Sequence, residues 1–350
     1  MKNIKGAAAM AIKAKELAQQ LGVSAATLSL VMNGKPGISD KTREKIIKEM
    51  QELGYGHLVK NPHAESQIQN TIGFVIYKND GKMLGLNSFY PLILDGVENT
   101  ARKYGYNLVI INLERADIEQ QIHYITDANC VGYVIFATEM QHNEIDYFEN
   151  LGIPFVLLDN YYNDRMMNTV KVNNEQGCYL AVKHLIEMGH RRIGYLSSGL
   201  SINSFMERRR FSKEALASFG IMDMEKYTYQ IGYPIDQAAE GIVPVLKKHK
   251  KSDLPTAFLA DNDLVAIGAM QGMKEMGYQL PDDFSFVGNA DRPISSLVEP
   301  KLTTIRVPQE RFGSEAVFQL IQQLQNQEKS FTRVEINGEL IVRDSVKNIN

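Results

Sequence analysis

The sequence predicts an α/β protein with an N-terminal helix-turn-helix head and two doubly wound parallel-sheet lobes. Two observations predict this architecture: the helix-turn-helix spacing within residues 12–55, and an alternation of short apolar runs with amphipathic stretches from Thr71 onward. With 350 residues, the chain is long enough for two or three domains. Its 44% hydrophobic and 23% charged residues are typical of a soluble globular protein.

The head begins with two short helices joined by a tight turn. Ala18 is small where the helices would cross, and Gly22 can adopt the positive φ that the turn requires. Leu28 and Val31 lie three residues apart and would face the first helix. Ser24 can N-cap the second helix, which in such a motif is the recognition helix. An ordinary helical hairpin has the same pattern, so this spacing alone leaves DNA binding open.

Two further features of the head favour a polyanionic partner. A third amphipathic helix follows, with Ile46, Ile47, Met50 and Leu53 at helical spacing. Residues 1–60 contain nine Lys and one Arg against five acidic residues, a net charge of +5, whereas the whole chain has a net charge of −3. A basic head on an acidic body is suited to binding nucleic acid through the head only.

The cysteines and the N-terminus predict a cytoplasmic protein. Cys130 and Cys178 are isolated, with neither metal-ligand spacing nor a disulfide framework, as expected in a reducing compartment. Residues 6–12 imitate a signal peptide, but this apolar run is short, and Lys13 and Lys15 end it without a cleavage-like site. Since no apolar run approaches the ~20 residues of a membrane span, no membrane partner is expected.

After a polar stretch at residues 56–70, apolar runs and amphipathic helices alternate along the body. Parallel doubly wound sheets bind ligands beyond the carboxyl ends of their strands, and two facing lobes form a cleft for a small molecule. Strands are expected at 72–77, 108–112, 131–136 and 155–159 in a first series and at 170–172, 193–196, 227–231, 257–260 and 284–287 in a second, with helices near 91–104, 115–128, 142–150, 174–188, 205–219, 236–248 and 263–276.

Several blocks in this order resemble the lactose-repressor/galactose-repressor family of bacterial transcription regulators. They are Gly22 to Asn33, Ile38 to Lys45, Ala181 to Tyr195, Asp261 to Gly268 and Leu302 to Ile305. The resemblance implies lobes of periplasmic-binding-protein type, a homodimer on a roughly palindromic double-stranded operator, and a small polar effector, such as a carbohydrate or sugar phosphate, between the lobes. It implies neither a cofactor nor a metal. The implied domains are a head of residues 1–58, a linker of 59–70, an N-terminal lobe of 71–162 and 306–326, and a C-terminal lobe of 163–305 and 327–350.

The recognition segment departs from the family at its base-reading positions. Ala25, Ala26 and Leu30 fill these positions, where many members carry polar or Arg residues. They can contact thymine methyl groups but cannot form bidentate pairs with guanine or adenine, so readout through backbone and DNA shape is expected. Leu30 has an alternative role as a packing residue. The remaining residues that the resemblance places at DNA are suited to phosphate contacts: Ser24, Thr27, Ser29 and Asn33.

The linker departs more strongly from the family. His57 and Leu58 replace its Pro-Asn pair, Ala64 replaces the Leu that wedges into the minor groove, and Pro62 falls inside the would-be helix. Whether a hinge helix forms at residues 56–66 therefore stays open.

The effector site is partly retained. Phe89 and Tyr90 can stack on a ring, and the Arg208 guanidinium suits paired hydroxyls or a carboxylate. Ala290 replaces an Asp that usually holds sugar hydroxyls. The ligand-binding residues implied are thus Phe89, Tyr90, Asp159, Arg208, Asn262 and Asp291.

Two rival functions agree less well with the sequence. A periplasmic sugar-binding protein without a DNA role shares the two-lobed fold, but it has no use for a helix-turn-helix. An enzyme is disfavoured because we find no nucleophile elbow, phosphate-binding loop or dinucleotide fingerprint. His184 and His190 lie in a family block and are expected to be structural. The sequence therefore predicts a ligand-responsive, DNA-binding transcription regulator that is not an enzyme. A repressor is expected, while the choice between repressor and activator stays open.

Overall fold

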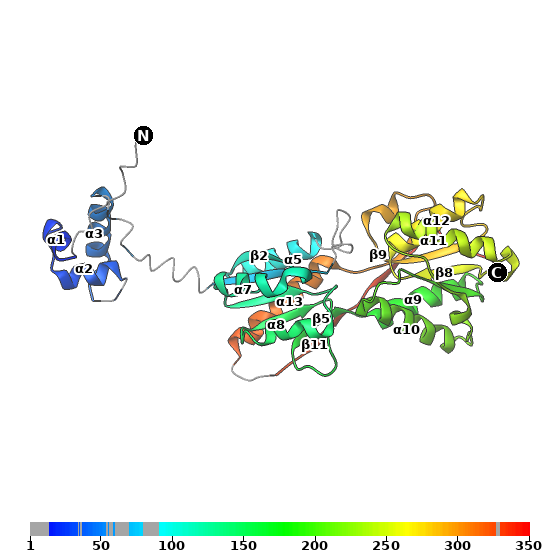
Figure 1. Cartoon of the computed structure of the whole chain (residues 1–350), viewed down its shortest axis with the longest axis horizontal. Coiled ribbons are helices and arrows are strands. Elements are labelled where there is room, and N and C mark those ends of the chain that lie inside the picture. Colours follow the sequence, from blue (N-terminus) through cyan, green and yellow to red (C-terminus); the bar gives the residue numbers. More distant parts are fainter. Residues whose placement is uncertain are drawn as a thin grey trace. The chain divides into compact units, whose positions relative to one another are not determined.

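A computed structural model describes residues 14–33, 35, 37–53, 55, 59, 70–79, 91–326 and 330–350 (Figure 1). The chain forms two compact units, residues 1–70 and 71–350, which we describe separately. Phe89, Tyr90 and the linker positions 57, 58, 62 and 64 lie outside the described residues, so the predictions made for them stay predictions. In the described ranges no helix is long and apolar enough to cross a bilayer.

The first unit is a helix-turn-helix with a third helix. Gly22 has φ 62° in the turn, and the side chain of Ser24 accepts a hydrogen bond from the Thr27 amide, which confirms both expected roles. Leu53, which is at helical spacing in the sequence, lies just past the last helix and is 49% exposed. The helices are α1 (Ala14–Gln20), α2 (Ala25–Met32) and α3 (Asp40–Glu52), and their buried core contains Leu17, Ala18, Leu21, Leu28, Val31, Ile46 and Met50.

The second unit contains two six-stranded sheets, each covered by helices on both faces, and we call them the N-terminal and C-terminal lobes. The first sheet has the order β11-β5-β4-β3-β1-β2 and is parallel throughout. Its strands are β1 (Thr71–Lys78), β2 (Asn107–Glu114), β3 (Gly132–Phe136), β4 (Phe155–Leu158), β5 (Asn168–Val172) and β11 (Arg333–Ile336).

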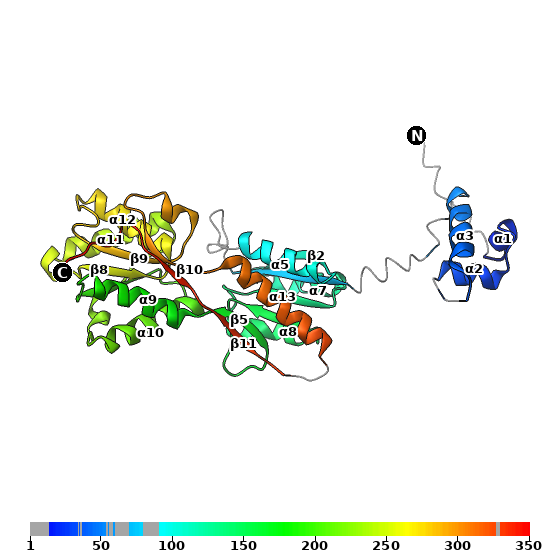
Figure 2. The same cartoon turned by 180° about the vertical axis from the view of Figure 1, so that it is seen from behind.

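Helices α5 (Pro91–Lys103) and α13 (Gln309–Gln325) lie side by side over one face of this sheet (Figures 1 and 2). They approach closely because each contributes a glycine at the crossing, Gly96 and Gly313, whose missing Cβ leaves room for the other helix's backbone. The opposite face is covered by short segments instead of the long helices expected at 115–128 and 142–150: η2 (Arg115–Asp117), α6 (Ile118–Gln121), α7 (His123–Asp127), η3 (His142–Ile145) and α8 (Asp146–Glu149).

The second sheet has the order β12-β10-β9-β8-β6-β7, and only β12 runs antiparallel to its neighbour. Its strands are β6 (Ile193–Ser197), β7 (Thr228–Gln230), β8 (Ala257–Ala260), β9 (Ser285–Ala290), β10 (Thr303–Arg306) and β12 (Glu339–Ile341). Helices α9 (Asn174–Glu187) and α10 (Asn203–Ser218) cover one face, and α11 (Ile235–Lys248) and α12 (Asp263–Glu275) cover the other. Short 3-10 turns are η4 (Met224–Tyr227), η5 (Lys251–Asp253) and η6 (Pro293–Ser296).

The lobe boundaries differ from those expected. β5 pairs with β4 in the first sheet, so assigning residues 170–172 to the second lobe was wrong. β11 also joins the first sheet, through β5, so residues 327–350 do not belong to the C-terminal lobe as a whole. The chain passes between lobes after β5, after β10 and after β11. The polar loop that follows β4 resembles a lobe boundary in sequence, but it is a connection within one sheet.

Candidate DNA-binding and effector sites

The start of the recognition helix α2 is fixed by its own hydroxyl groups. Ser24 Oγ lies 2.9 Å from the Thr27 amide and 2.8 Å from Thr27 Oγ1, so these two hydroxyls bond to each other at the helix N-terminus. Ala25, Ala26 and Ser29 are exposed and present a surface of small side chains. Such a surface allows the helix to approach a groove closely, whereas few polar groups extend from it to read base edges.

The end of α2 is bound to the third helix. Leu30 is half-buried, and Asn33 Nδ2 donates to the Ser29 carbonyl at 2.9 Å. The Arg43 guanidinium donates to the carbonyls of Leu30 and Lys35, at 3.1 and 2.5 Å. Arg43 therefore holds the turn after the recognition helix. In the sequence, Arg43 counted only towards the +5 charge of the head, and nothing there gave a signal of this structural role.

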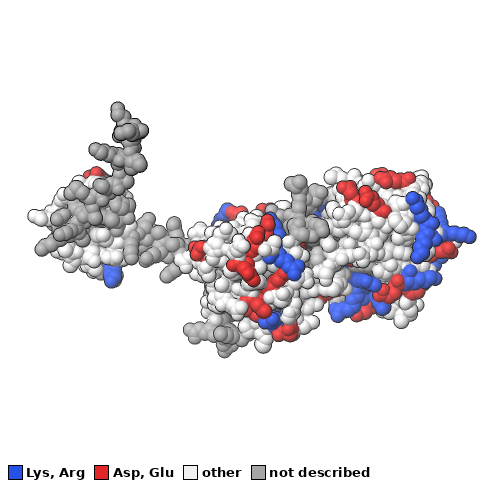
Figure 3. Space-filling model, in the orientation of Figure 1, with Lys and Arg blue, Asp and Glu red and all other residues white. Residues whose placement is uncertain are grey.

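Over the face of the second unit seen in Figure 3, acidic and basic side chains are interspersed and do not form one continuous basic surface. This mixed distribution agrees with the expectation that the body does not bind a polyanion.

In the second unit, Arg208 lies on α10 and is 8% exposed. Its Nε donates to Asn174 Oδ1 at 3.0 Å, and its Nη1 donates to the Asp261 carbonyl at 2.7 Å. The neighbouring Arg209 and Arg210 are exposed and pair with Glu residues, as expected for a solvated helix start. Arg208 is thus held rigidly by two hydrogen bonds within the C-terminal lobe.

Two further polar residues are Asn262, which follows the Asp261 carbonyl that holds Arg208, and Asp159, whose carboxyl interacts electrostatically with Arg208. Asn262 Oδ1 caps α12 by accepting from the Val265 amide at 3.1 Å. Its Nδ2 is buried and has no hydrogen-bond partner among the described residues. Asp159 lies on the other lobe, just after β4, with φ 65°. Burial raises the pKa of Asp159 to about 6, although the hydroxyl of Thr138 and the positive charge of Arg208 act in the opposite direction.

Asp291 is not available as predicted. Its two carboxylate oxygens accept from Arg306 Nε at 2.7 Å and from Arg343 Nη2 at 2.5 Å. A carboxylate already bonded to two guanidinium groups is a poor partner for effector hydroxyls, so the structure disfavours the predicted ligand role. The two arginines come from β10 and from the segment after β12, far away in sequence, which is why the pairing was not foreseen.

The two residues beside Asn262, in the block from Asp261 to Gly268, hold it in place. The Asp261 carboxylate accepts from the Ser198 amide at 2.6 Å and from the Tyr195 hydroxyl at 2.9 Å. Asp263 accepts from the Thr304 hydroxyl at 2.5 Å, and burial raises the pKa of both carboxyls. The two acids tie strand ends together on either side of Asn262 and so fix its position.

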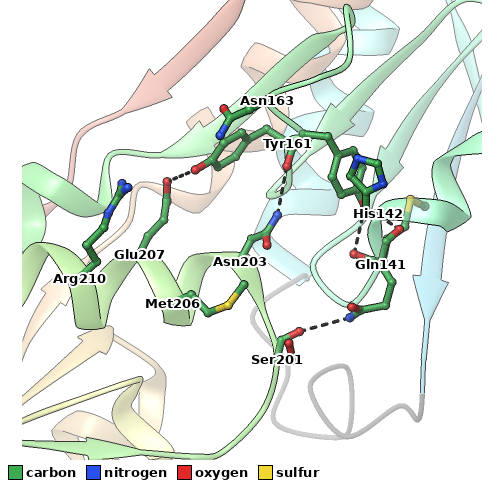
Figure 4. A pocket seen from close by; sticks show the side chains of 11 residues that line it. Gln141, His142, Tyr161, Asn163, Ser201, Asn203, Met206, Glu207 and Arg210 are labelled. Atoms are coloured by element: carbon green, nitrogen blue, oxygen red, sulfur yellow. Dashed lines mark hydrogen bonds between the residues drawn. The ribbon is translucent and has the colours of Figure 1, made fainter.

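Two cavities open between the lobes, of about 340 and 260 Å³. Both are bordered by Gln141 and Ser201, and Gln141 Nε2 donates across the lobes to the Ser201 carbonyl at 3.2 Å (Figure 4). The larger cavity is lined by Tyr161, Asn203 and Glu207, which the sequence did not single out. Arg208, Asn262 and Asp159 line neither cavity and are buried.

A helix-turn-helix unit, together with a two-lobed body in which buried polar groups from both lobes converge, defines the class of ligand-responsive, DNA-binding transcription regulators. Residues 13–56 match the model of the bacterial regulatory proteins of the lacI family, and residues 182–346 match the periplasmic binding protein-like domain. The chain therefore carries a lacI-family regulatory domain at its head and a periplasmic binding protein-like domain in its body, as the resemblance implied.

Its relatives match along nearly their whole length. The HTH-type transcriptional repressors PurR of Photobacterium profundum and Vibrio vulnificus are 26% and 27% identical to the chain. Each match covers 96% of this chain and 99% of the relative. Among solved structures, the regulator CelR in complex with cellobiose has a TM-score of 0.71 at 24% identity, covering 95% of this chain and 99% of CelR. The lac repressor dimer bound to operator and the anti-inducer ONPF has a TM-score of 0.73 at 24% identity, covering 96% and 99%.

Proposed function

We propose that this protein is a transcriptional repressor that binds a roughly palindromic operator as a homodimer and responds to a small polyhydroxylated effector held between its lobes. The observation that carries the proposal is the buried Nδ2 donor of Asn262, which has no hydrogen-bond partner among the described residues and follows directly on the Asp261 carbonyl that holds Arg208. A buried donor without a partner costs about 1–3 kcal/mol, a penalty that a bound ligand would remove. The relatives named as repressors support the regulatory part.

The chemistry of the three converging groups suits hydroxyls. Asn262 offers a donor, Arg208 a charged donor, and Asp159 an acceptor, and a hydroxyl can pair with each of these. A carbohydrate or sugar phosphate supplies several hydroxyls on one rigid ring. The structures of CelR with cellobiose and of an Enterococcus faecium lacI-family regulator with ribose support this class.

The proposed dimer uses apolar side chains that the monomer leaves in solvent. β2 is an edge strand of its sheet, and Val109 and Ile110 on it are 37% and 46% exposed. In the C-terminal lobe Leu297 is 80% exposed. Large apolar side chains on an unpaired edge favour burial against a second copy. The dimer in the lac repressor structure supports this assembly.

In this proposal the head contacts DNA through α2, with Ala25, Ala26 and Leu30 in the groove. The hydroxyl and amide groups of Ser24, Thr27, Ser29 and Asn33 lie near the phosphates. A gel shift with DNA from upstream of the protein's own gene tests this, using the full chain and a variant lacking residues 1–60. The full chain should bind, with affinity falling steeply as salt rises, and the truncated protein should not. Equal binding by the truncated protein would favour a binding protein without this DNA role.

The effector is sought by thermal-shift screening of the full chain against sugars and sugar phosphates. A hit should stabilise the body, because it binds the folded state only. If no compound of the panel shifts the melting temperature, although the gel shift shows that the protein binds its operator, the carbohydrate class is wrong and the DNA-binding assignment stands.

A further inference from the structure

The carboxylate of Glu207 forms hydrogen bonds that join the two lobes. It lies on α10 of the C-terminal lobe and is 6% exposed. Its Oε1 accepts from the Tyr161 hydroxyl at 2.7 Å and from Lys171 Nζ at 2.6 Å, and both partners belong to the N-terminal lobe (Figure 4 shows the Tyr161 bond). Lys171 also lies 3.4 Å from Glu335 on β11. Burial acts to raise the pKa of Glu207, but hydrogen bonds from Lys171, Tyr161 and Asn174 outweigh it and lower this pKa, so the carboxylate is ionised.

The second oxygen of Glu207 connects it to Arg208 through Asn174, the first residue of α9. Asn174 Nδ2 donates to Glu207 Oε2 at 2.8 Å, and Asn174 Oδ1 accepts from Arg208 Nε at 3.0 Å. An ionised carboxylate only accepts and a guanidinium only donates, so this arrangement permits one orientation of the Asn174 amide. Asn174 lies two residues after β5, where the chain passes between the lobes.

We propose that Glu207 is a positioning residue that, through the Asn174 amide, orients the Arg208 guanidinium for the effector and links that orientation to closure of the lobes. The proposal rests on the effector role proposed for Arg208. The physical reason is that one carboxylate is shared: one oxygen is bonded to the N-terminal lobe and the other fixes the amide that holds Arg208. Separation of the lobes would remove the Tyr161 and Lys171 donors from Glu207. Glu207 and the Asn174 amide bonded to it would then be free to reorient.

The polarity of this network allows a test by exchange of groups. In Glu207→Gln the amide oxygen must still face the Lys171 ammonium, which only donates, so the NH₂ group lies against the NH₂ of Asn174. Asn174→Asp places two carboxylates together, so each single substitution breaks the connection. The double variant restores it with the polarity reversed, because the new glutamine donates to the new aspartate, whose other oxygen accepts from Arg208 Nε. The matched control is Glu214→Gln, an exposed carboxyl on the same helix.

The first measurement is the hydrogen-exchange rate of Arg208 Nε–H in the full chain labelled with ¹⁵N-arginine, with the signal assigned by its loss in Arg208→Lys. Exchange should be about tenfold faster in each single variant, as expected for loss of a hydrogen bond to a charged group. It should return to the wild-type rate in the double variant and stay unchanged in the control. An unchanged rate in Glu207→Gln, or a double variant as fast as the faster single variant, would overturn the proposal.

The second measurement tests closure by amide hydrogen exchange with mass spectrometry. Residues 158–163 and 200–206, which face each other across the lobes, should exchange faster in Glu207→Gln and recover in the double variant. Residues 263–275 of α12 serve as an internal reference, because general destabilisation would accelerate them as well. If they accelerate equally, Glu207 is merely structural and the proposal is wrong. Neither measurement needs effector or DNA, so the proposal can fail while the proposed function stands.

Discussion

The guanidinium of Arg43 donates to the backbone carbonyl of Leu30 over 3.1 Å, and so joins the third helix of the head to the end of the recognition helix. The same carbonyl accepts from the Lys35 amide at 3.0 Å. The last carbonyls of a helix have no partner within the helix, and a cation is the most favourable partner at that end. Arg43 therefore sets the orientation of α2 in the head and is unavailable as a phosphate contact.

Replacing Arg43 with Met should destabilise the end of α2. The substitution keeps the apolar stem but removes two charge-assisted hydrogen bonds, a loss of about 1.5–3 kcal/mol. Amide exchange of residues 27–33 in the full chain should accelerate, and operator affinity should fall with it. The control is Lys48→Met, which removes an exposed charge from the same helix. If Lys48→Met weakens DNA binding as much while exchange in Arg43→Met is unchanged, Arg43 acts through charge alone.

A Leu30→Arg substitution should add base-specific readout to the head. An arginine at this position could form a bidentate pair with guanine, worth about 1–3 kcal/mol at one base position per half-site. The measurement is a base-substitution scan of the operator with both proteins. Gln51→Arg, which adds the same charge elsewhere on the head, should strengthen binding without changing the preferred base. An unaltered scan for Leu30→Arg would show that residue 30 is a packing residue, as its half-buried state allows.

Asn262→Asp should separate the two roles of this side chain. An aspartate keeps an oxygen that accepts from the Val265 amide, so the N-cap of α12 is retained. It loses the buried Nδ2 donor, and the effector should bind about 10–100-fold more weakly, as expected for one lost hydrogen bond in a buried site. Calorimetry with the effector found by screening measures the affinity. An unchanged affinity would place the effector away from Asn262.

Local chemistry is where the sequence was most informative. The turn glycine and the Ser24 cap were predicted correctly, because both depend on neighbours within three residues. The alternation of strands and helices also predicted the two parallel-sheet lobes. The placement of β5 was wrong, because strand order depends on pairing between distant segments and the apolar run at 170–172 carries no information about its partner.

In the candidate site, too, the sequence revealed some residues and missed those whose roles depend on contacts with distant segments. Arg208 and Asn262 were identified from the family resemblance, and both are buried. Asp291 was expected to bind ligand, but its role depends on arginines 15 and 52 residues away. Glu207 was overlooked although it is adjacent to Arg208, since a single glutamate on a helix full of charges resembles a solvated residue. Only its burial and its contacts with Lys171 and Tyr161 reveal its role.

The raised pKa of Asp159 predicts a pH dependence of stability. In the folded protein this pKa is about 6, whereas an unfolded aspartate titrates near 3.9. Between these values the folded state binds more protons than the unfolded state, so the carboxyl's contribution to stability falls as pH rises from about 4 to about 6 and is level above. Asp159→Asn removes this contribution while keeping an oxygen for the Thr138 hydroxyl. The free energy of unfolding of the variant, relative to that of the wild type, should therefore increase by up to about 3 kcal/mol as pH rises from 4 to 7.

Denaturant unfolding of the two proteins at several pH values measures this difference, and the pH dependence common to all other groups cancels between them. Glu214→Gln is the exposed control and should show no such gain. A constant difference between wild type and Asp159→Asn would mean that the carboxyl titrates normally in the folded state. A confirmed gain would show that the free protein maintains a costly buried carboxylate at neutral pH. Effector hydroxyls donating to that carboxylate would remove part of this cost, so effector affinity should weaken as pH falls below about 6 in the wild type and stay level in Asp159→Asn.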